Sequence, residues 1–213
     1  MGIKKIKISL SEKLLIIFLI TLISAVSAFY YIVRDKCFFA NDLNINYLPK
    51  NKTIAIIEIE CGKIAIQIDE ELSPKNTERF KYLIENKKYV NSVFYRVKKN
   101  KFVEAGDLIY GMQDSIDYLR IGTGGSSMSN LNSELNNNFN FIKGTVGMVR
   151  RGKFDTENSQ FFILLEDMPS FNFQYTPIGT IISGLELLKS IKQGDKSEYV
   201  LRPDIIIDTS LMN

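Results

Sequence analysis

Residues 14–33, with the sequence LLIIFLITLISAVSAFYYIV, contain no charged side chain. Twenty apolar-leaning residues are long enough to cross a bilayer as one helix. Basic residues flank the segment on both sides. Residues 1–36 contain six Lys or Arg against one Glu and one Asp, a net charge of +4, whereas the whole chain carries +3. The pattern predicts a membrane-spanning or secretory helix whose N-terminus lies in the cytoplasm.

Two interpretations of this helix remain open. An uncleaved signal anchor would place Tyr30 and Tyr31 at the far membrane interface, whereas a cleaved secretory signal would end at the small residues Val26-Ser27-Ala28 and release the protein after cleavage near Ala28. Apolar length favours the anchor, and a buried core helix is the least favoured alternative. The expected organisation is a basic region with a transmembrane helix (1–36, helix over about 14–33), a polar linker (37–52) and a domain on the periplasmic or extracytoplasmic side (53–213).

The chain contains no histidine and only two cysteines. A Ser-His-Asp triad, a Cys-His dyad, histidine-based zinc or haem ligation and a structural zinc site are therefore excluded within this chain. The net charge of +3 is too small to indicate a nucleic-acid partner. If the domain is exported, Cys37 and Cys61 face an oxidising compartment, and whether the two pair stays open at this point.

Short alternating segments dominate the rest of the chain. Residues 53–60 and 63–69 alternate apolar and polar side chains around the turn Cys61-Gly62, which predicts a hairpin. Ser73, as N-cap, and Pro74 begin an amphipathic helix, and residues 183–191 predict a second one. Further strands are predicted at 92–97, 101–107, 144–149, 159–165, 179–181 and 204–208. Many short strands, glycine-rich turns and two helices predict a mainly β fold built as a closed antiparallel barrel.

Four segments carry the functional signal: FYRVKKNKFVEAGD (94–107), GTGG (122–125), GTVGMVRRGKFDTENSQFFILL (144–165) and FNFQYTPIG (171–179). Each is weak alone, since GTGG lacks the lysine and helix of a phosphate loop and Ser159 lacks a nucleophile elbow. In this order and spacing they resemble the cyclophilin family of peptidyl-prolyl cis/trans isomerases, from about Thr53 to the C-terminus, in a divergent, bacterial-like form. The residues that carry the resemblance are Phe94-Tyr95-Arg96-Val97, Gly106-Asp107, Gly144-Thr145-Val146-Gly147-Met148 and Ser159-Gln160-Phe161-Phe162.

The resemblance implies a closed eight-stranded antiparallel barrel capped by two α-helices, and rotation of X–Pro bonds without cofactor or metal. Arg96 matches the family's catalytic arginine, which hydrogen-bonds near the prolyl nitrogen and carbonyl. Substrate-binding positions carry over as Phe162 (pocket floor), Phe171 (pocket wall), Phe102 (a methionine in the family), Tyr175 (often a histidine), Gln160 (substrate backbone), Val149 and Arg150 (the strand that pairs with substrate) and Glu104. The implied partners are proline-containing polypeptides and, through residues 14–33, the membrane; we expect a monomer.

Several positions depart from the family pattern. Glu104 stands where the family usually has a glutamine that orients the arginine, and a carboxylate there forms an ion pair that dampens the field of Arg96 at the substrate. Lys101 aligns with a pocket phenylalanine, whose role Phe102 would take through a shift of one residue. About nine extra residues lie between Asp107 and Gly122. These departures indicate a divergent pocket.

Three functions therefore compete. The favoured one is an active isomerase that assists the folding of exported or envelope proteins. The second is a catalytically weak or inactive peptide-binding or chaperone module that is tethered to the membrane, as Glu104 and Lys101 suggest. The third is a structural element whose functional part is the membrane helix.

Overall fold

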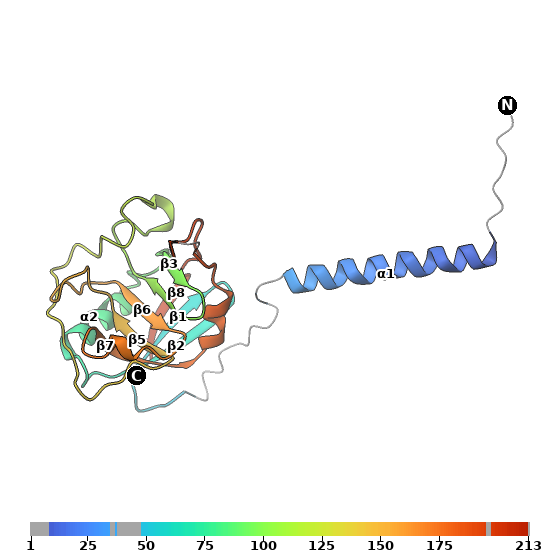
Figure 1. The fold of residues 1–213 in the computed structure, drawn as a ribbon. Helices are drawn as coiled ribbons and strands as arrows, with labels where there is room; N and C mark the ends of the chain where they lie inside the picture. The colour runs from blue at the N-terminus through green and yellow to red at the C-terminus, as the bar shows by residue number, and fades with distance from the viewer. Residues whose placement is uncertain (1–8, 35–36, 38–47, 195–196, 213) are drawn as a thin grey trace. The chain divides into compact units, whose positions relative to one another are not determined.

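The computed structural model describes residues 9–34, 37, 48–194 and 197–212. The chain divides into two compact units, Met1–Phe39 and Ala40–Asn213 (Figure 1). The basic residues before position 9 and positions 38–47 of the predicted linker (37–52) lie outside the described residues.

The first unit contains one long helix, α1, from Leu10 to Arg34. Ser9 and Glu12 form a reciprocal cap at its start: the Glu12 carboxylate accepts the Ser9 N–H at 2.6 Å, and the Ser9 hydroxyl accepts the Glu12 N–H at 3.3 Å. The stretch Leu10–Tyr30 is long and apolar enough to cross a membrane by length and composition. The prediction of one N-terminal hydrophobic helix is confirmed, and the helix begins four residues earlier than expected.

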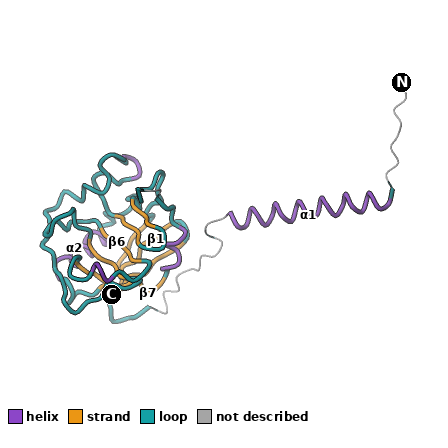
Figure 2. The backbone as a smooth tube through the Cα atoms, in the orientation of Figure 1, coloured by secondary structure: helices purple, strands orange, loops and turns teal. Residues whose placement is uncertain are grey.

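The second unit is built on one sheet whose neighbouring strands are all antiparallel. Its order is β3-β4-β6-β5-β7-β2-β1-β8. Figure 2 shows these strands at the centre of the unit, with loops wrapped around them. The strands are β1 (Ile54–Ile59), β2 (Gly62–Ile68), β3 (Arg96–Lys98), β4 (Phe102–Ala105), β5 (Thr145–Met148), β6 (Phe161–Leu164), β7 (Thr176–Ser183) and β8 (Asp208–Met212).

The sheet curls into a half-barrel that is not closed, so the prediction of a closed barrel is corrected. Within the described residues, no ladder joins the edge strands β3 and β8. Single bridges, Arg96 to Tyr199 and Val93 to Ile205, stand in that gap instead. The bridging segment contains Pro203, which has no N–H to donate, and β3 is only three residues long, so a continuous ladder cannot form there.

The prediction of two α-helices in this unit is also corrected. Apart from α1, the described residues contain one α-helix, α2 (Pro74–Glu85), while Leu185–Ser190 forms a short 3₁₀ helix, η4. Ser73 precedes α2 as predicted, but its hydroxyl donates to the Pro177 carbonyl rather than capping the helix. The Glu134 carboxylate accepts the N–H groups of Lys75 (3.2 Å) and Asn76 (2.9 Å) in its place. Two further 3₁₀ turns are η2 (Gln113–Ser115) and η3 (Pro169–Phe171).

The core lies between α2 and the sheet. Phe80 of α2, Tyr89 and Phe161 of β6 are fully buried and pack with ring centroids 5.2 to 5.7 Å apart. The Tyr89 hydroxyl donates to the Ser159 carbonyl at 2.6 Å, so the polar end of this buried ring is satisfied. This packing fixes β6, the strand from which the candidate site is built.

Neither cysteine of the chain is a free thiol. Cys37 and Cys61 both lie within the described residues, and Cys61 occupies the turn between β1 and β2, as the hairpin predicted.

Candidate functional site

Adjacent residues of β6 face opposite sides of the sheet. Phe161 packs into the core on Phe80 and Tyr89, whereas Phe162 faces a second aromatic group on the other side. The Phe162 ring sits over Gly147, where an added Cβ would lie 2.5 Å from the ring. The glycine in β5 therefore makes room for the phenylalanine in β6.

The residues around Phe162 form one apolar group. Its rings lie close together, with centroid separations of 5.4 Å for Phe162–Phe171, 5.3 Å for Phe162–Tyr175 and 4.5 Å for Phe171–Tyr175. Tyr175 and Phe171 are only partly buried, so the group reaches the surface. We call this set the aromatic cluster; its members are Phe102, Phe139, Phe141, Leu164, Val149, Phe162, Met168, Phe171 and Tyr175.

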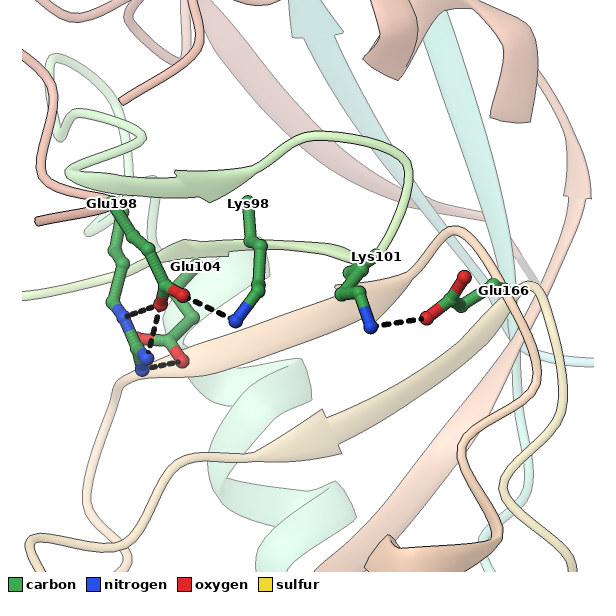
Figure 3. Close-up of polar contacts among 6 residues, drawn as sticks. Lys98, Lys101, Glu104, Glu166 and Glu198 are labelled. Atoms are coloured by element: carbon green, nitrogen blue, oxygen red, sulfur yellow. Dashed lines mark hydrogen bonds and ion pairs between the residues drawn. The ribbon is translucent and has the colours of Figure 1, made fainter. Parts of the chain in front are cut away.

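The aromatic cluster brings together all five predicted apolar site residues: Phe102, Val149, Phe162, Phe171 and Tyr175. Sequence reasoning missed Phe139 and Phe141, which lie in an asparagine-rich stretch over residues 128–142. The alternation of the two aromatics in that segment was the available signal. Phe102 is 5 % exposed and belongs to the cluster, whereas Lys101 is not a member and pairs with Glu166 at 3.1 Å (Figure 3).

Gln160 lies directly before Phe161 and is 2 % exposed. Its backbone carbonyl accepts the Val149 N–H at 2.9 Å, which ties β6 to the segment that follows β5. Neither atom of its side-chain amide has a hydrogen-bond partner among the described residues. Because a buried polar group without a partner costs about 1–3 kcal/mol, this amide is suited to bind a polar group from outside the chain.

Arg96 begins β3 and lies opposite Glu104 of β4 in the sheet register. Its Nη1 donates to the Glu104 carboxylate at 2.8 Å, so the ion pair expected from the sequence is present. The guanidinium carbon lies 4.9 Å from the centre of the Phe102 ring. The cation is therefore packed against the aromatic cluster and is not held away from it by Glu104.

A second carboxylate also holds Arg96. Glu198, 102 residues further along the chain, accepts hydrogen bonds from Nε at 3.0 Å and from Nη2 at 2.5 Å. Its other oxygen pairs with Lys98 at 2.5 Å (Figure 3). Sequence reasoning missed Glu198, because nothing in the local pattern around it points to Arg96.

The two carboxylates differ in environment. Burial raises the pKa of Glu104, and the neighbouring Arg96 charge opposes that rise. The hydrogen bond from Lys98 lowers the pKa of Glu198, and Arg96 lowers it further. When the pH falls from neutral, Glu104 is therefore neutralised before Glu198.

Arg150 covers the exposed edge of the aromatic cluster. Its Nε donates to the Gln174 carbonyl at 2.8 Å, and its guanidinium carbon lies 5.1 Å from the Tyr175 ring centre. The same group lies 4.5 Å from the Phe154 ring centre. The predicted residue Arg150 is thus at the site, where its side chain borders the cluster.

Asp107 organises the loop beside the site. Its side chain is fully buried and accepts five backbone N–H groups, those of Ile109, Tyr110, Gly122, Gly124 and Gly125, at 2.8 to 3.2 Å. A Cβ at Gly124 would lie 2.2 Å from one oxygen of Asp107, so glycine is required for this approach. The base of the extra segment and the GTGG loop are therefore held by one carboxylate.

Comparison with known proteins places this geometry in a wider context. Residues 54–211 match the family described as cyclophilin type peptidyl-prolyl cis-trans isomerase/CLD. A probable peptidyl-prolyl cis-trans isomerase of Brucella abortus is 36 % identical over 166 residues, which cover 76 % of this chain and 83 % of the relative. A human relative named probable inactive peptidyl-prolyl cis-trans isomerase-like 6 is 26 % identical over 149 residues, 65 % of this chain and 45 % of that one.

The fold has solved counterparts as well. The crystal structure of a Cryptosporidium parvum cyclophilin type peptidyl-prolyl cis-trans isomerase, in the presence of the dipeptide Ala-Pro, superposes with a TM-score of 0.65. Its sequence is 24 % identical, and the match covers 75 % of this chain and 99 % of that one. At this identity the likeness concerns the fold.

Proposed function

Because the chain belongs to the family of cyclophilin-type peptidyl-prolyl cis-trans isomerases, we propose that Arg96 is its catalytic residue and that the aromatic cluster receives the substrate proline. The observation that carries the proposal is the position of the Arg96 guanidinium, 4.9 Å from the Phe102 ring at the margin of the cluster. A cation and an apolar group that reaches the surface stand side by side, and X–Pro rotation draws on both.

The chemistry needs little more than this arrangement. Amide resonance sets a barrier of about 18–20 kcal/mol for rotation of the peptide bond. An N–H donor near the prolyl nitrogen stabilises the twisted amide, in which that nitrogen becomes pyramidal, while the ring is held in an apolar slot. Three of the five guanidinium N–H groups of Arg96 are used by Glu104 and Glu198, so one N–H on Nη1 and one on Nη2 are left for the substrate.

The remaining predicted site residues bind the substrate in this proposal. The unsatisfied amide of Gln160 hydrogen-bonds the substrate backbone. Val149 and Arg150 lie along the segment that would pair with the substrate residues before proline. Arg150 covers the outer edge of the aromatic cluster beside Tyr175. Glu104 acts on the substrate through Arg96.

The first prediction concerns Glu104. Glu104→Gln keeps an acceptor for Nη1 but removes a negative charge beside Arg96, so kcat/KM for X–Pro isomerisation is expected to rise about threefold. A protease-coupled assay on the full chain in detergent micelles measures it. An unchanged or lower rate would contradict damping by Glu104.

The pH dependence follows from the same carboxylate. Because burial raises the pKa of Glu104 above the usual glutamate value of 4.5, the parent should gain activity as the pH falls from neutral toward that pKa, whereas Glu104→Gln should lack this rise. Burial of the charged Glu104 lowers the free energy of unfolding above the folded pKa, and this loss is relieved as the pH falls below it. The parent should therefore lose no folding stability from Glu104 in this pH window. Thermal unfolding at each pH checks that both proteins remain folded.

For the cellular role, we infer that α1 anchors the chain and that the domain assists the folding of exported or envelope proteins. The length and apolarity of α1 support the anchor, and the lack of free thiols at Cys37 and Cys61 supports an oxidising compartment. Protease added to sealed, right-side-out vesicles should digest residues 53–213 while α1 stays with the membrane. Full protection of the domain would contradict this orientation. A soluble protein whose N-terminus lies just after Ala28 would favour the cleaved alternative.

A catalytically weak peptide-binding module is the second candidate. It is favoured by the two carboxylates that pair with Arg96 and neutralise its charge. The family usually has a neutral glutamine where this chain has Glu104. This candidate predicts saturable binding of a proline-containing peptide, seen as NMR shifts at Phe162 and Gln160, without any acceleration of cis/trans exchange.

A further inference from the structure

The segment that carries Glu198 is fixed against β3 by its backbone. The Val97 N–H donates to the Glu198 carbonyl at 2.8 Å, and the Val200 N–H donates to the Tyr95 carbonyl at 3.0 Å. These bonds flank Arg96 on both sides in sequence. The Glu198 Cα is therefore held at a set place beside the arginine, although the two residues are 102 positions apart.

Glu198 adopts a backbone conformation that glutamate rarely takes. Its φ is +68°, in the left-handed region, which a non-glycine residue keeps only where its surroundings impose it. In this conformation the carboxylate meets Arg96, and the side chain is 19 % exposed. A glycine or asparagine would fit the turn better, so the carboxylate itself accounts for the residue.

The contacts of Glu198 are directional. One oxygen accepts both Nε and Nη2, which lie along one edge of the guanidinium plane, and the other oxygen is held by Lys98. Glu104 holds a different nitrogen, Nη1. Two carboxylates on different edges of a planar group fix its orientation, which a single contact cannot do.

We propose that Glu198 is a positioning residue that fixes the direction of the Arg96 guanidinium relative to the aromatic cluster. The inference rests on the proposed role of Arg96. Glu198 acts through the arginine and does not touch the substrate. Its partner Lys98 holds the far oxygen of the carboxylate and so keeps Glu198 itself in place (Figure 3).

The test uses the full chain in detergent micelles, with isomerisation of an X–Pro peptide followed by NMR exchange spectroscopy. Glu198→Ala should lower kcat about tenfold with KM changed less than about twofold, because the guanidinium loses its direction. Glu198→Gln keeps an acceptor oxygen and should stay within about threefold of the parent. Glu166→Ala, which breaks the exposed Lys101–Glu166 pair beside the site, is the matched control and should leave the rate unchanged.

A double variant separates positioning from a general structural role. If Glu198 acts through Arg96, Glu198→Ala should have no further effect in an Arg96→Ala background. An equal loss in both backgrounds would overturn the proposal.

A second readout does not depend on activity. The Arg96 Nε–H should exchange slowly with solvent in the parent and in Glu166→Ala, and at least about tenfold faster in Glu198→Ala. Unchanged exchange in Glu198→Ala would overturn positioning by Glu198. A parent that binds peptide without catalysis, yet shows this Glu198-dependent protection, would instead sink the proposed function and leave the orientation of Arg96 by Glu198 standing.

Discussion

Replacing Arg96 by alanine is expected to lower kcat/KM for X–Pro isomerisation by about 10²–10³-fold, which is the usual cost of removing one preorganised donor from the transition state. The guanidinium is a cationic donor beside the aromatic cluster, and its contact with Phe102 places it at the margin of that cluster. Exchange spectroscopy measures the residual rate at a raised protein concentration.

Arg96→Lys provides the control for charge and folding. Lysine keeps a positive charge near Glu104, which is only 12 % exposed and would otherwise be left without its partner. It cannot reproduce the planar fork that contacts Glu104 and Glu198 together, so activity should still fall at least about tenfold. If Arg96→Lys or Arg96→Ala keeps parental activity in a folded protein, Arg96 is not the catalytic residue.

The largest effect on stability is expected at Asp107. Asp107→Ala leaves five backbone N–H groups without their acceptor, and the free energy of unfolding should fall by about 3–5 kcal/mol. Urea unfolding of the full chain in micelles, followed by tyrosine fluorescence, measures the shift in midpoint. Asp107→Asn keeps one acceptor oxygen and should lose less.

Asp117→Ala is the matched control for Asp107. Asp117 lies in the same extra segment and also accepts backbone N–H groups, from Leu119 and Arg120, but these are solvent-exposed contacts. Water can replace an exposed acceptor, so this variant should shift the unfolding midpoint far less. Equal shifts for Asp107→Ala and Asp117→Ala would contradict the role given to the buried carboxylate.

Local patterns predicted the parts of the fold that depend on local contacts. The alternation in residues 53–60 and 63–69 placed β1 and β2, since a hairpin is set by its turn and by the side chains that face each other. The motif Ser159-Gln160-Phe161-Phe162 led to the strand at the centre of the candidate site. Its two phenylalanines face opposite sides of the sheet, because successive side chains of a strand alternate. Phe161 packs on Phe80, and Phe162 belongs to the aromatic cluster.

The features that sequence reasoning missed depend on distant contacts. Residues 204–208 read as the final strand because of their isoleucines, but β8 is Asp208–Met212. All of its residues pair with β1, and the Thr209 hydroxyl donates to the Ile84 carbonyl. The helix expected at 183–191 is a 3₁₀ turn, since Gly184 starts it in a left-handed conformation and it spans only six residues. Glu198 could not be identified from the sequence, because its role depends on contact with Arg96, which is 102 positions away in the chain.

The site residues follow the same division. Phe102, Phe162, Phe171 and Tyr175 were named from their motifs and gather in the aromatic cluster, whereas Phe139 and Phe141 come from an asparagine-rich segment outside those motifs. The side chains that meet across the curled sheet cannot be paired from one sequence alone, because their contacts depend on how strands far apart in the chain are brought together.

The most direct measurement of the central claim is the cis/trans exchange rate of an X–Pro peptide in the presence of the full chain in micelles. The account predicts that catalytic amounts of the parent accelerate exchange well above the uncatalysed process, which takes about tens to hundreds of seconds, and that Arg96→Ala reduces the acceleration by about 10²–10³-fold. Peptide binding at the aromatic cluster with an unaccelerated exchange rate would contradict it.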